Sequence, residues 1–368
     1  MVENSAAGIL PAHQISDLAK AGHIVSETPL SNDQTQPASL DLRLGAIAYR
    51  VRASFLPGPS LTVADRLNVL KLHEIALAEG AVLETGCVYI VPLMESLKLP
   101  ADLSAAANPK SSTGRLDIFT RVIADRAREF DAVPAGYAGP LYLEVSPRTF
   151  PIVVRAGSRL SQIRFRRGNA RLTDAELLAV HRKVGLVDGM PNISNGIAVS
   201  IDLTANPGGG GYVGFRAKRH TGIVDVDKRG LCDALDYWEP LPPDRRQELV
   251  LDPAQFYILV SREAVHVPPE YAAEMVPFDP LVGEFRVHYA GFFDPGFGHQ
   301  AAGGEGSRAV LEVRSHEIPF ILEHGQVVGR LVYERMAELP KKLYGDDIGS
   351  HYQAQGLKLS KHFRPLDR

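Results

Sequence analysis

The feature that most constrains the fold of this chain is an internal repeat at a constant offset of 168 positions. The matched positions are Leu83 and Leu251, Tyr89 and Tyr257, Pro100 and Pro268, Glu144 and Glu312, Pro151 and Pro319, and Gly157 and Gly325. Self-similarity at one offset indicates a duplicated domain. Residues 39–42 also resemble residues 200–203, at a slightly different offset. The sequence therefore predicts two copies of one domain.

Each copy has the sequence pattern of a β domain. Short apolar runs such as VYIVPL, LYLEV and FYILV are separated by Gly, Pro and Asp, as in sandwiches and jelly rolls. One helix is expected at residues 172–186, where Thr173 and Glu176 form a capping-box pattern. We expect an all-β chain with a few short helices, made of domains 1–188 and 189–368, with this helix and the following loop as the linker.

Composition excludes several classes of partner. The 40 basic and 43 acidic residues are interspersed, and a net charge of -3 provides no extended field for a nucleic-acid backbone. The two cysteines lack the spacing of a cysteine-built zinc site. No apolar run reaches the ~18 residues of a membrane span. We expect a cytoplasmic protein that binds no nucleic acid and no membrane, and that binds any anionic partner locally.

Residues 109–116 bring together several hydrogen-bond donors. Lys110, Ser111, Ser112 and Arg115 surround a glycine, and such a set suits phosphate oxygens or a polar ring. The alternative is an exposed turn rich in serine and glycine.

Glu144 lies among apolar residues in the run LYLEV. A carboxylate on a buried strand costs free energy unless it is paired, and such a group suits general base catalysis. The alternative is a structural glutamate held in a salt bridge. A third polar segment, residues 343–356, contains Tyr344, His351 and Gln355 and predicts a loop that closes over a ligand. A disordered tail is the alternative there, although such tails are usually poor in tyrosine.

Taken in order, these segments resemble the dCTP deaminases of the dUTPase-like superfamily. The resemblance runs through residues 36–45 (QPASLDLRLG), Lys110-Ser111-Ser112 with Arg115, residues 124–126 (ADR), Glu144 and residues 344–355. It implies tandem dUTPase-like β-barrel or jelly-roll domains, with the family's single domain present here as a fused pair. It also implies deamination of dCTP to dUTP and ammonia without zinc, and the chain lacks the signature of the zinc deaminases.

The resemblance also implies roles for individual residues. Glu144 is expected to act as general base on a water that attacks C4 of cytosine, and Ser111 and Arg115 are expected to position that water. The expected nucleotide-binding positions are Lys110, Ser112, Ala124, Arg126, Tyr344, His351 and Gln355. The family binds its triphosphate with Mg²⁺, which no protein side chain is expected to ligate, and its members are homotrimers with sites between subunits.

Two features depart from the family pattern. His351 stands where a lysine is frequent, and the stretch between Arg126 and Glu144 is longer than usual. In the second copy the residues at the offset of Lys110, Ser111 and Ser112 are Phe, Asp and Pro, and Arg115 becomes Gly283. We therefore expect the first copy to carry the chemistry, and the second copy to supply scaffold and the segment that covers the phosphates.

Two other functions stay open at this point. A dUTP diphosphatase, or an enzyme that both deaminates and cleaves, would share the fold and the anionic ligand, with Asp131 as a candidate carboxylate. Release of pyrophosphate would identify it. A nucleotide sensor without catalysis is the second, and loss of turnover on substitution of Glu144 would exclude it.

Overall fold

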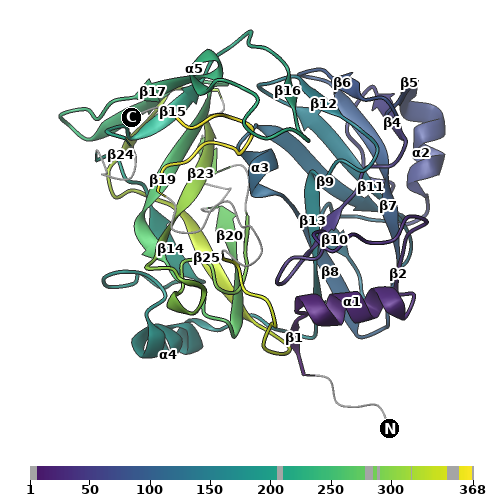
Figure 1. Ribbon diagram of the computed structural model, residues 1–368, viewed down its shortest axis with the longest axis horizontal. Helices are drawn as coiled ribbons and strands as arrows, with labels where there is room; N and C mark the ends of the chain where they lie inside the picture. The colour runs from purple at the N-terminus through teal and green to yellow at the C-terminus, as the bar shows by residue number, and fades with distance from the viewer. Residues whose placement is uncertain are drawn as a thin grey trace. The chain divides into compact units, whose positions relative to one another are not determined.

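The computed structural model describes residues 6–204, 210–277, 285–287, 291–315, 317–345 and 356–366. The chain divides into two compact units, most of whose elements are labelled in Figure 1. The first unit comprises Met1–Ala170, Gly222–Arg229 and Met336–Lys341, and the second comprises Arg171–Thr221, Gly230–Arg335 and Lys342–Arg368. Residue 188, the predicted boundary, lies inside the second unit.

The first unit consists of a five-stranded and a six-stranded sheet with a small three-stranded sheet beside them. Its helices are α1 (Ala12–Lys20), α2 (Val63–Leu70) and α3 (Ser111–Gly114). Its strands are β1 (Gly8–Ile9), β2 (Ile24–Val25), β3 (Leu40–Leu42), β4 (Ile47–Val51), β5 (Lys71–Ala76), β6 (Ala81–Leu83), β7 (Val88–Lys98), β8 (Leu103–Pro109), β9 (Ile118–Ala124), β10 (Ala132–Val133), β11 (Ala138–Pro147), β12 (Ile152–Val154), β13 (Ser161–Arg167) and β16 (Val224–Asp225).

The second unit has four-, five- and two-stranded sheets. Its helices are α4 (Asp174–Val184), α5 (Ala234–Tyr237) and the 3₁₀ turn η2 (Gln300–Ala302). Its strands are β14 (Ile197–Ser200), β15 (Gly214–Ala217), β17 (Trp238–Leu241), β18 (Glu248–Leu251), β19 (Phe256–Val265), β20 (Tyr271–Pro277), β21 (Phe285–Val287), β22 (Phe292–Phe293), β23 (Ser307–Ser315), β24 (Phe320–Glu323) and β25 (Val327–Arg335). The prediction of a mostly β chain is confirmed.

Strand registers confirm the duplication residue by residue. Glu144 pairs with Ile90 on β7, and Glu312, at the offset of 168, pairs with Ile258 on β19. Two further strand pairs of the first unit, Ser161 with Pro109 and Ile152 with Leu83, recur at the same offset. Their counterparts in the second unit are Gly329 with Pro277 and Phe320 with Leu251. Even a side-chain contact recurs, because the hydroxyls of Tyr89 and Tyr257 accept from the backbone N–H of Glu84 and Asp252 at 3.0 and 2.9 Å. The two copies therefore share one set of ladders.

One proposed match between the copies is wrong. The sequence pattern aligned Leu40 with Ile201, but the structure places Leu40 opposite Ile163 and Ile197 opposite Leu331. Since Ile163 and Leu331 are equivalent, Leu40 corresponds to Ile197, and the true match lies four residues earlier. The repeated Ser-Leu/Ile-Asp-Leu pattern misled the alignment because β14 needs only alternating apolar residues at this place.

The sequence predicted helix α4 correctly. The capping box of α4 is present, with Thr173 and Glu176 each accepting from the other's backbone N–H, and Leu177 of this helix is buried in the second unit. Helices α1 and α2 were not predicted. Helix α2 begins at a second capping box, Thr62 with Asp65, which uses aspartate where the usual pattern has glutamate. No helix among the described residues is long and apolar enough to cross a membrane.

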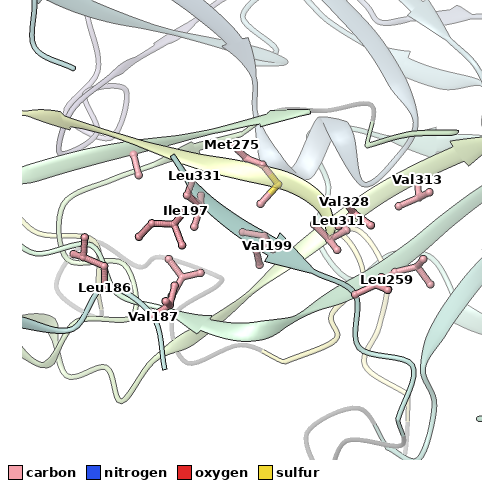
Figure 2. Close-up of a cluster of buried hydrophobic side chains, with 14 of the residues drawn as sticks. Leu186, Val187, Ile197, Val199, Leu259, Met275, Leu311, Val313, Val328 and Leu331 are labelled. Atoms are coloured by element: carbon pink, nitrogen blue, oxygen red, sulfur yellow. The ribbon is translucent and has the colours of Figure 1, made fainter. Parts of the chain in front are cut away.

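The core of the second unit is built from the inward-facing residues of its sheets. Figure 2 shows Ile197 and Val199 of β14 next to Leu331 of β25 and Met275 of β20. All four side chains are at most 3% exposed. Because successive strand residues point to opposite faces, alternate positions of β14 enter this core.

The first unit incorporates a strand from the second half of the sequence. Strand β16 pairs in parallel with β12, and the two lie side by side in Figure 1. Val224 is fully buried, and its backbone N–H donates to the carbonyl of Pro151 at 3.0 Å. Beside it, the guanidinium of Arg155 bonds both carboxylate oxygens of Asp225 at 2.8 and 2.9 Å, which lowers the pKa of Asp225. The first fold copy is therefore completed by residues outside its own repeat.

We predict that Val224→Ala destabilises the protein by about 1–3 kcal/mol, because it removes buried methyl groups and leaves a cavity. Urea unfolding followed by circular dichroism measures the change. Val69→Ala is the matched control, since Val69 is 72% exposed and the same deletion there should change stability by less than about 0.5 kcal/mol. Equal effects of the two substitutions would contradict the docking of β16.

Candidate functional site

Glu144 lies in the middle of the six-stranded sheet of the first unit. It is on β11, opposite Ile90 of β7 on one side and Arg121 of β9 on the other. Its side chain is 1% exposed, and Leu143 and Val145 beside it are fully buried. The sequence therefore predicted both the strand and the burial of this carboxylate correctly.

The two oxygens of the Glu144 carboxylate have different environments. Oε1 accepts from Nε of Arg121 at 3.1 Å and from its Nη2 at 2.6 Å. Oε2 is buried and has no hydrogen-bond partner among the described residues. A buried carboxylate oxygen without a donor is costly. This oxygen is therefore ready to accept a proton or a hydrogen bond from a molecule that enters the site.

Arg121 is a residue of this site that the sequence analysis missed. Its guanidinium lies 3.5 Å from the ring centroid of Phe130 and 4.7 Å from that of Phe119, and Nη2 donates to the Ser54 hydroxyl at 2.7 Å. These contacts hold the cation in one orientation. A signal existed in the sequence, because Arg121 is the one charged residue in the apolar run of β9, IFTRVIA, and a buried carboxylate needs such a partner.

The donor segment 110–115 forms the short helix α3 at the end of β8. Lys110 is the N-cap residue of α3 and Arg115 its C-cap residue, and the backbone N–H of Arg115 donates to the carbonyl of Ser111 at 3.1 Å. Ser112 and Arg115 are buried, whereas Ser111 is partly exposed. The alternative of an exposed turn is wrong for this segment. Helix α3 packs against β9, the strand that carries Arg121.

The ammonium of Lys110 forms an ion pair with the buried carboxylate of Asp41 on β3. Asp41 is the acidic residue of the QPASLDLRLG segment, so part of this segment holds Lys110 in place. Asp41 was not among the predicted site residues. Its Oδ1 is buried and has no hydrogen-bond partner among the described residues.

The rest of the same segment is structural. Arg43 forms an ion pair with buried Glu95, with 2.7 Å between Nε and Oε1. The N–H of Gly45 donates to the carbonyl of Pro92 at 2.8 Å. A Cβ at position 45 would lie 2.6 Å from that oxygen, so only glycine permits the contact.

The Ala124 to Arg126 segment begins where β9 ends. Oδ1 of Asp125 accepts from the N–H of Val63 at 2.8 Å, and the N–H of Asp125 donates to the Tyr137 hydroxyl at 3.0 Å. That hydroxyl donates to the Pro140 carbonyl at 2.6 Å, and burial raises the pKa of Tyr137 to about 12. Ala124 is buried, and Arg126 is exposed with a positive φ of 60°. The segment is thus anchored at its centre, and its arginine faces solvent.

Of the predicted covering segment 343–356, the structure describes residues 343–345 and 356. Tyr344 belongs to the second unit, where its ring centroid lies 5.7 Å from that of Phe297 and its N–H donates to the Pro295 carbonyl at 2.8 Å. His351 and Gln355 lie outside the described residues.

Among the described residues of one chain, the Glu144 carboxylate forms its hydrogen bonds with Arg121. Ser111 and Arg115 therefore do not bond it directly, although they stand on a neighbouring element of the same unit. In the part of the chain that the structure describes, no three His, Cys, Asp or Glu side chains gather closely enough to hold a metal ion.

Comparison with protein families assigns both halves of the chain. Residues 6–169 match the N-terminal domain of 2'-deoxycytidine 5'-triphosphate deaminase, and residues 173–363 match the C-terminal domain of that family. A crystal structure of 2'-deoxycytidine 5'-triphosphate deaminase from Agrobacterium tumefaciens is 68% identical and superimposes with a TM-score of 0.86, covering 90% of this chain and 99% of that one.

Other relatives align with less than half of the chain. A dCTP deaminase from Halorubrum lacusprofundi is 33% identical over 162 residues, which are 43% of this chain and 76% of the relative. A relative from Coprothermobacter proteolyticus, described as a dUMP-forming dCTP deaminase, is 30% identical over 160 residues, or 43% of this chain and 81% of its own length.

We predict that Arg121→Met destabilises the protein by about 2–4 kcal/mol, because it leaves the Glu144 charge buried without compensation. We place the loss slightly below that of a fully buried pair because the Arg121 side chain is 24% exposed. Thermal unfolding of Arg121→Met, Glu144→Gln and the double variant forms a double-mutant cycle. Adding Glu144→Gln to Arg121→Met should recover part of the loss, whereas strictly additive effects would show that the pair does not interact.

Proposed function

Since the chain belongs to the 2'-deoxycytidine 5'-triphosphate deaminase family, we propose that its first unit hydrolyses the 4-amino group of dCTP with Glu144 as general base and without zinc. The observation that carries this proposal is the asymmetric carboxylate. One oxygen of Glu144 is held by Arg121, and the other is buried without a donor. A general base must be oriented and must have a lone pair free for the incoming proton.

The proposed reaction begins with a water that is hydrogen-bonded to Oε2 of Glu144. As the water oxygen attacks C4 of the cytosine ring, one of its protons passes to Oε2 and from there to the ring nitrogen N3. The carboxylate then takes the remaining proton from the new C4 hydroxyl and gives it to the 4-amino group; the C4–O bond becomes a carbonyl, the C4–N bond breaks, and ammonia leaves. The products are dUTP and ammonia, and the carboxylate is regenerated. No redox cofactor is required by this balance of atoms and electrons.

Arg121 has a positioning role in this proposal. Its two bonds to Oε1 restrict rotation of the carboxylate, so Oε2 keeps one direction. The flanking rings of Phe119 and Phe130 keep the guanidinium in place. A single defined orientation of the base lowers the entropic cost of reaching the transition state.

The donor segment 110–115 is proposed to bind the reacting parts of the substrate. Ser111 and Arg115 position the water and stabilise charge near C4. The backbone at Ala124 holds the cytosine ring. The proposed nucleotide-binding residues are Lys110, Ser112, Arg126, Tyr344, His351 and Gln355. The triphosphate is proposed to carry Mg²⁺, which neutralises phosphate charge and needs no protein ligand.

We also propose that the functional form is an oligomer. The carboxylate of Glu144 has no bond to Ser111 or Arg115 within its own chain. Residues of another molecule of this protein can complete the set of groups around Oε2, as the homotrimers of the family suggest.

The second copy retains a buried glutamate but not its companions. Glu312 on β23 is 5% exposed and occupies the ladder position of Glu144. The sequence at the positions of Lys110, Ser111, Ser112 and Arg115 is Phe, Asp, Pro and Gly, and this stretch lies outside the described residues. A proline and an apolar ring donate no hydrogen bond to phosphate. The second copy is therefore proposed to be scaffold.

A second candidate function is cleavage of the triphosphate after deamination. It is favoured by relatives described as dUMP-forming. The carboxylate of Asp131, a candidate base for that step, accepts the N–H of Val122 at 2.7 Å and so closes the β9 to β10 connection. This structural use makes Asp131 a weaker candidate than Glu144 for activating water.

We predict that Glu144→Gln lowers kcat for dCTP deamination by about 100- to 10,000-fold, because the amide cannot take the proton of the attacking water. Glu312→Gln is the matched control in the second copy and should leave kcat within about twofold of the parent. Ammonia release gives the rates, and calorimetry should show that both variants still bind dCTP. Unchanged turnover in Glu144→Gln would instead support a site elsewhere or a nucleotide sensor.

We predict that dCTP yields dUTP and ammonia in equal amounts, without pyrophosphate. The test compares dCTP, dCMP, CTP and dUTP, with ammonia, pyrophosphate and nucleotide products measured separately. Pyrophosphate formed from dCTP or dUTP at the rate of ammonia release would establish the cleaving enzyme and overturn the simple deaminase.

A further inference from the structure

The second unit contains a small cavity of about 190 Å³ that the proposed deamination does not use. Ser200 of β14 and Glu263 of β19 lie in its wall, together with Val327 of β25. In the loop before β14, Met190 and Asn192 lie at its rim, and both are exposed. The cavity thus combines a carboxylate with apolar surface.

The repeat shows what occupies the same place in the first unit. The N–H of Arg43 donates to Oε2 of Glu95 at 2.9 Å, and the N–H of Ser200 donates to Oε2 of Glu263 at 2.8 Å. Glu95 and Glu263 are separated by the repeat offset of 168. The registers of β3 and β14 give the same correspondence. Ser200 is therefore the counterpart of Arg43, and Glu263 is the counterpart of Glu95.

In the first unit this place is filled by the arginine side chain. Nε of Arg43 donates to Oε1 of Glu95 at 2.7 Å. Its other guanidinium nitrogens donate to the carbonyls of Pro29 and Thr28 at 3.1 and 2.7 Å, and to the Ser26 hydroxyl at 2.9 Å. Arg43 and Glu95 are 7% and 0% exposed. The guanidinium is thus an internal ligand for the carboxylate.

In the second unit the arginine is absent but the carboxylate remains. Among the described residues, the Glu263 carboxylate accepts only from the N–H and the hydroxyl of Ser200, at 2.8 and 2.5 Å. An ionised carboxylate accepts about four hydrogen bonds, so half of this capacity is unused. Among the residues that the structure describes, no cation forms an ion pair with Glu263, although it is only partly exposed. Replacement of Arg43 by Ser200 has therefore left both a space and an uncompensated charge.

We propose that this cavity binds the guanidinium group of a small ligand, with Glu263 as the anionic partner. In the first unit one guanidinium N–H, Nε of Arg43, donates to Oε1 of Glu95, and a free guanidinium can bond a carboxylate through two of its N–H groups. The volume of 190 Å³ is below the ~300 Å³ of typical drug-sized pockets, so it suits a head group with a short alkyl stem. Val187 and Val327 line the cavity and provide apolar contacts for that stem.

Arg262 also lines the cavity, and its side chain is exposed. No ion pair joins it to Glu263 in the described part of the chain. A ligand whose far end carries a carboxylate or another acceptor would bond Arg262 while its guanidinium bonds Glu263. The site therefore favours a guanidino compound with an anionic or polar tail over a simple cation.

The test uses 4-guanidinobutyrate and N-propylguanidinium as probes, with N-propylurea as a neutral compound of the same shape. Binding to the full-length protein is followed by saturation-transfer NMR and calorimetry. Both guanidinium compounds should bind, 4-guanidinobutyrate more tightly, and N-propylurea should not. In Glu263→Gln the affinity for both should fall by about tenfold or more, because a charge-assisted bond is lost.

A second variant tests the structural correspondence without depending on the ligand. Ser200→Arg should place a guanidinium on Glu263 as in the first unit, raise Tm and abolish binding of both probes. Binding that survives in Ser200→Arg, or that is equal for N-propylguanidinium and N-propylurea, would overturn the proposal. So would unchanged affinity in Glu263→Gln.

The guanidinium can also come from an arginine side chain of another protein molecule rather than from a free compound. Sedimentation of the purified protein with and without 4-guanidinobutyrate distinguishes these sources. Self-association that the probe disrupts, and that Glu263→Gln removes, would identify another molecule of this protein as the guanidinium donor. Unchanged sedimentation together with probe binding would identify a free ligand.

Discussion

Burial of the Glu144 charge is the constraint on which the rest of the site depends. A carboxylate in the centre of a sheet is stable only when a cation and hydrogen-bond donors compensate it. Arg121 compensates one oxygen from the adjacent strand, and two aromatic rings hold its guanidinium. The other oxygen is left without a donor. The sheet therefore contains a buried carboxylate oxygen without a hydrogen-bond donor, at the place where the proposed chemistry needs a general base.

The two copies of the domain share their strand pairing but differ in the side chains proposed for the chemistry. Equivalent ladders, down to the tyrosine that caps the same turn in each copy, show that backbone pairing has been kept in both units. The side chains on these ladders differ. Asp41, which holds Lys110 in the first unit, corresponds to Ala198 in the second, and Arg43 corresponds to Ser200. Because a ladder requires only backbone groups, one copy can lose its charged residues while the fold is retained.

The sequence predicted the features that depend on periodicity and local chemistry. These include the repeat, the β class, the capping box of α4 and the burial of Glu144. It did not predict Arg121 as the partner of Glu144, because that contact depends on which strands are neighbours and in which register. The short helix α2 was missed because aspartate replaced glutamate in its capping box. The false match of residues 39–42 to 200–203 arose because alternating apolar patterns are alike in many strands, and only hydrogen-bond partners fix the register.

The central claim is that a water molecule activated in the first unit attacks the pyrimidine ring. It is tested most directly by running the reaction in water enriched in ¹⁸O and locating the label in the nucleotide product by mass spectrometry. One ¹⁸O atom at O4 of the uracil ring and none in the phosphates is the result that this account predicts. Label in a phosphate group, or an unlabelled ring, would contradict it.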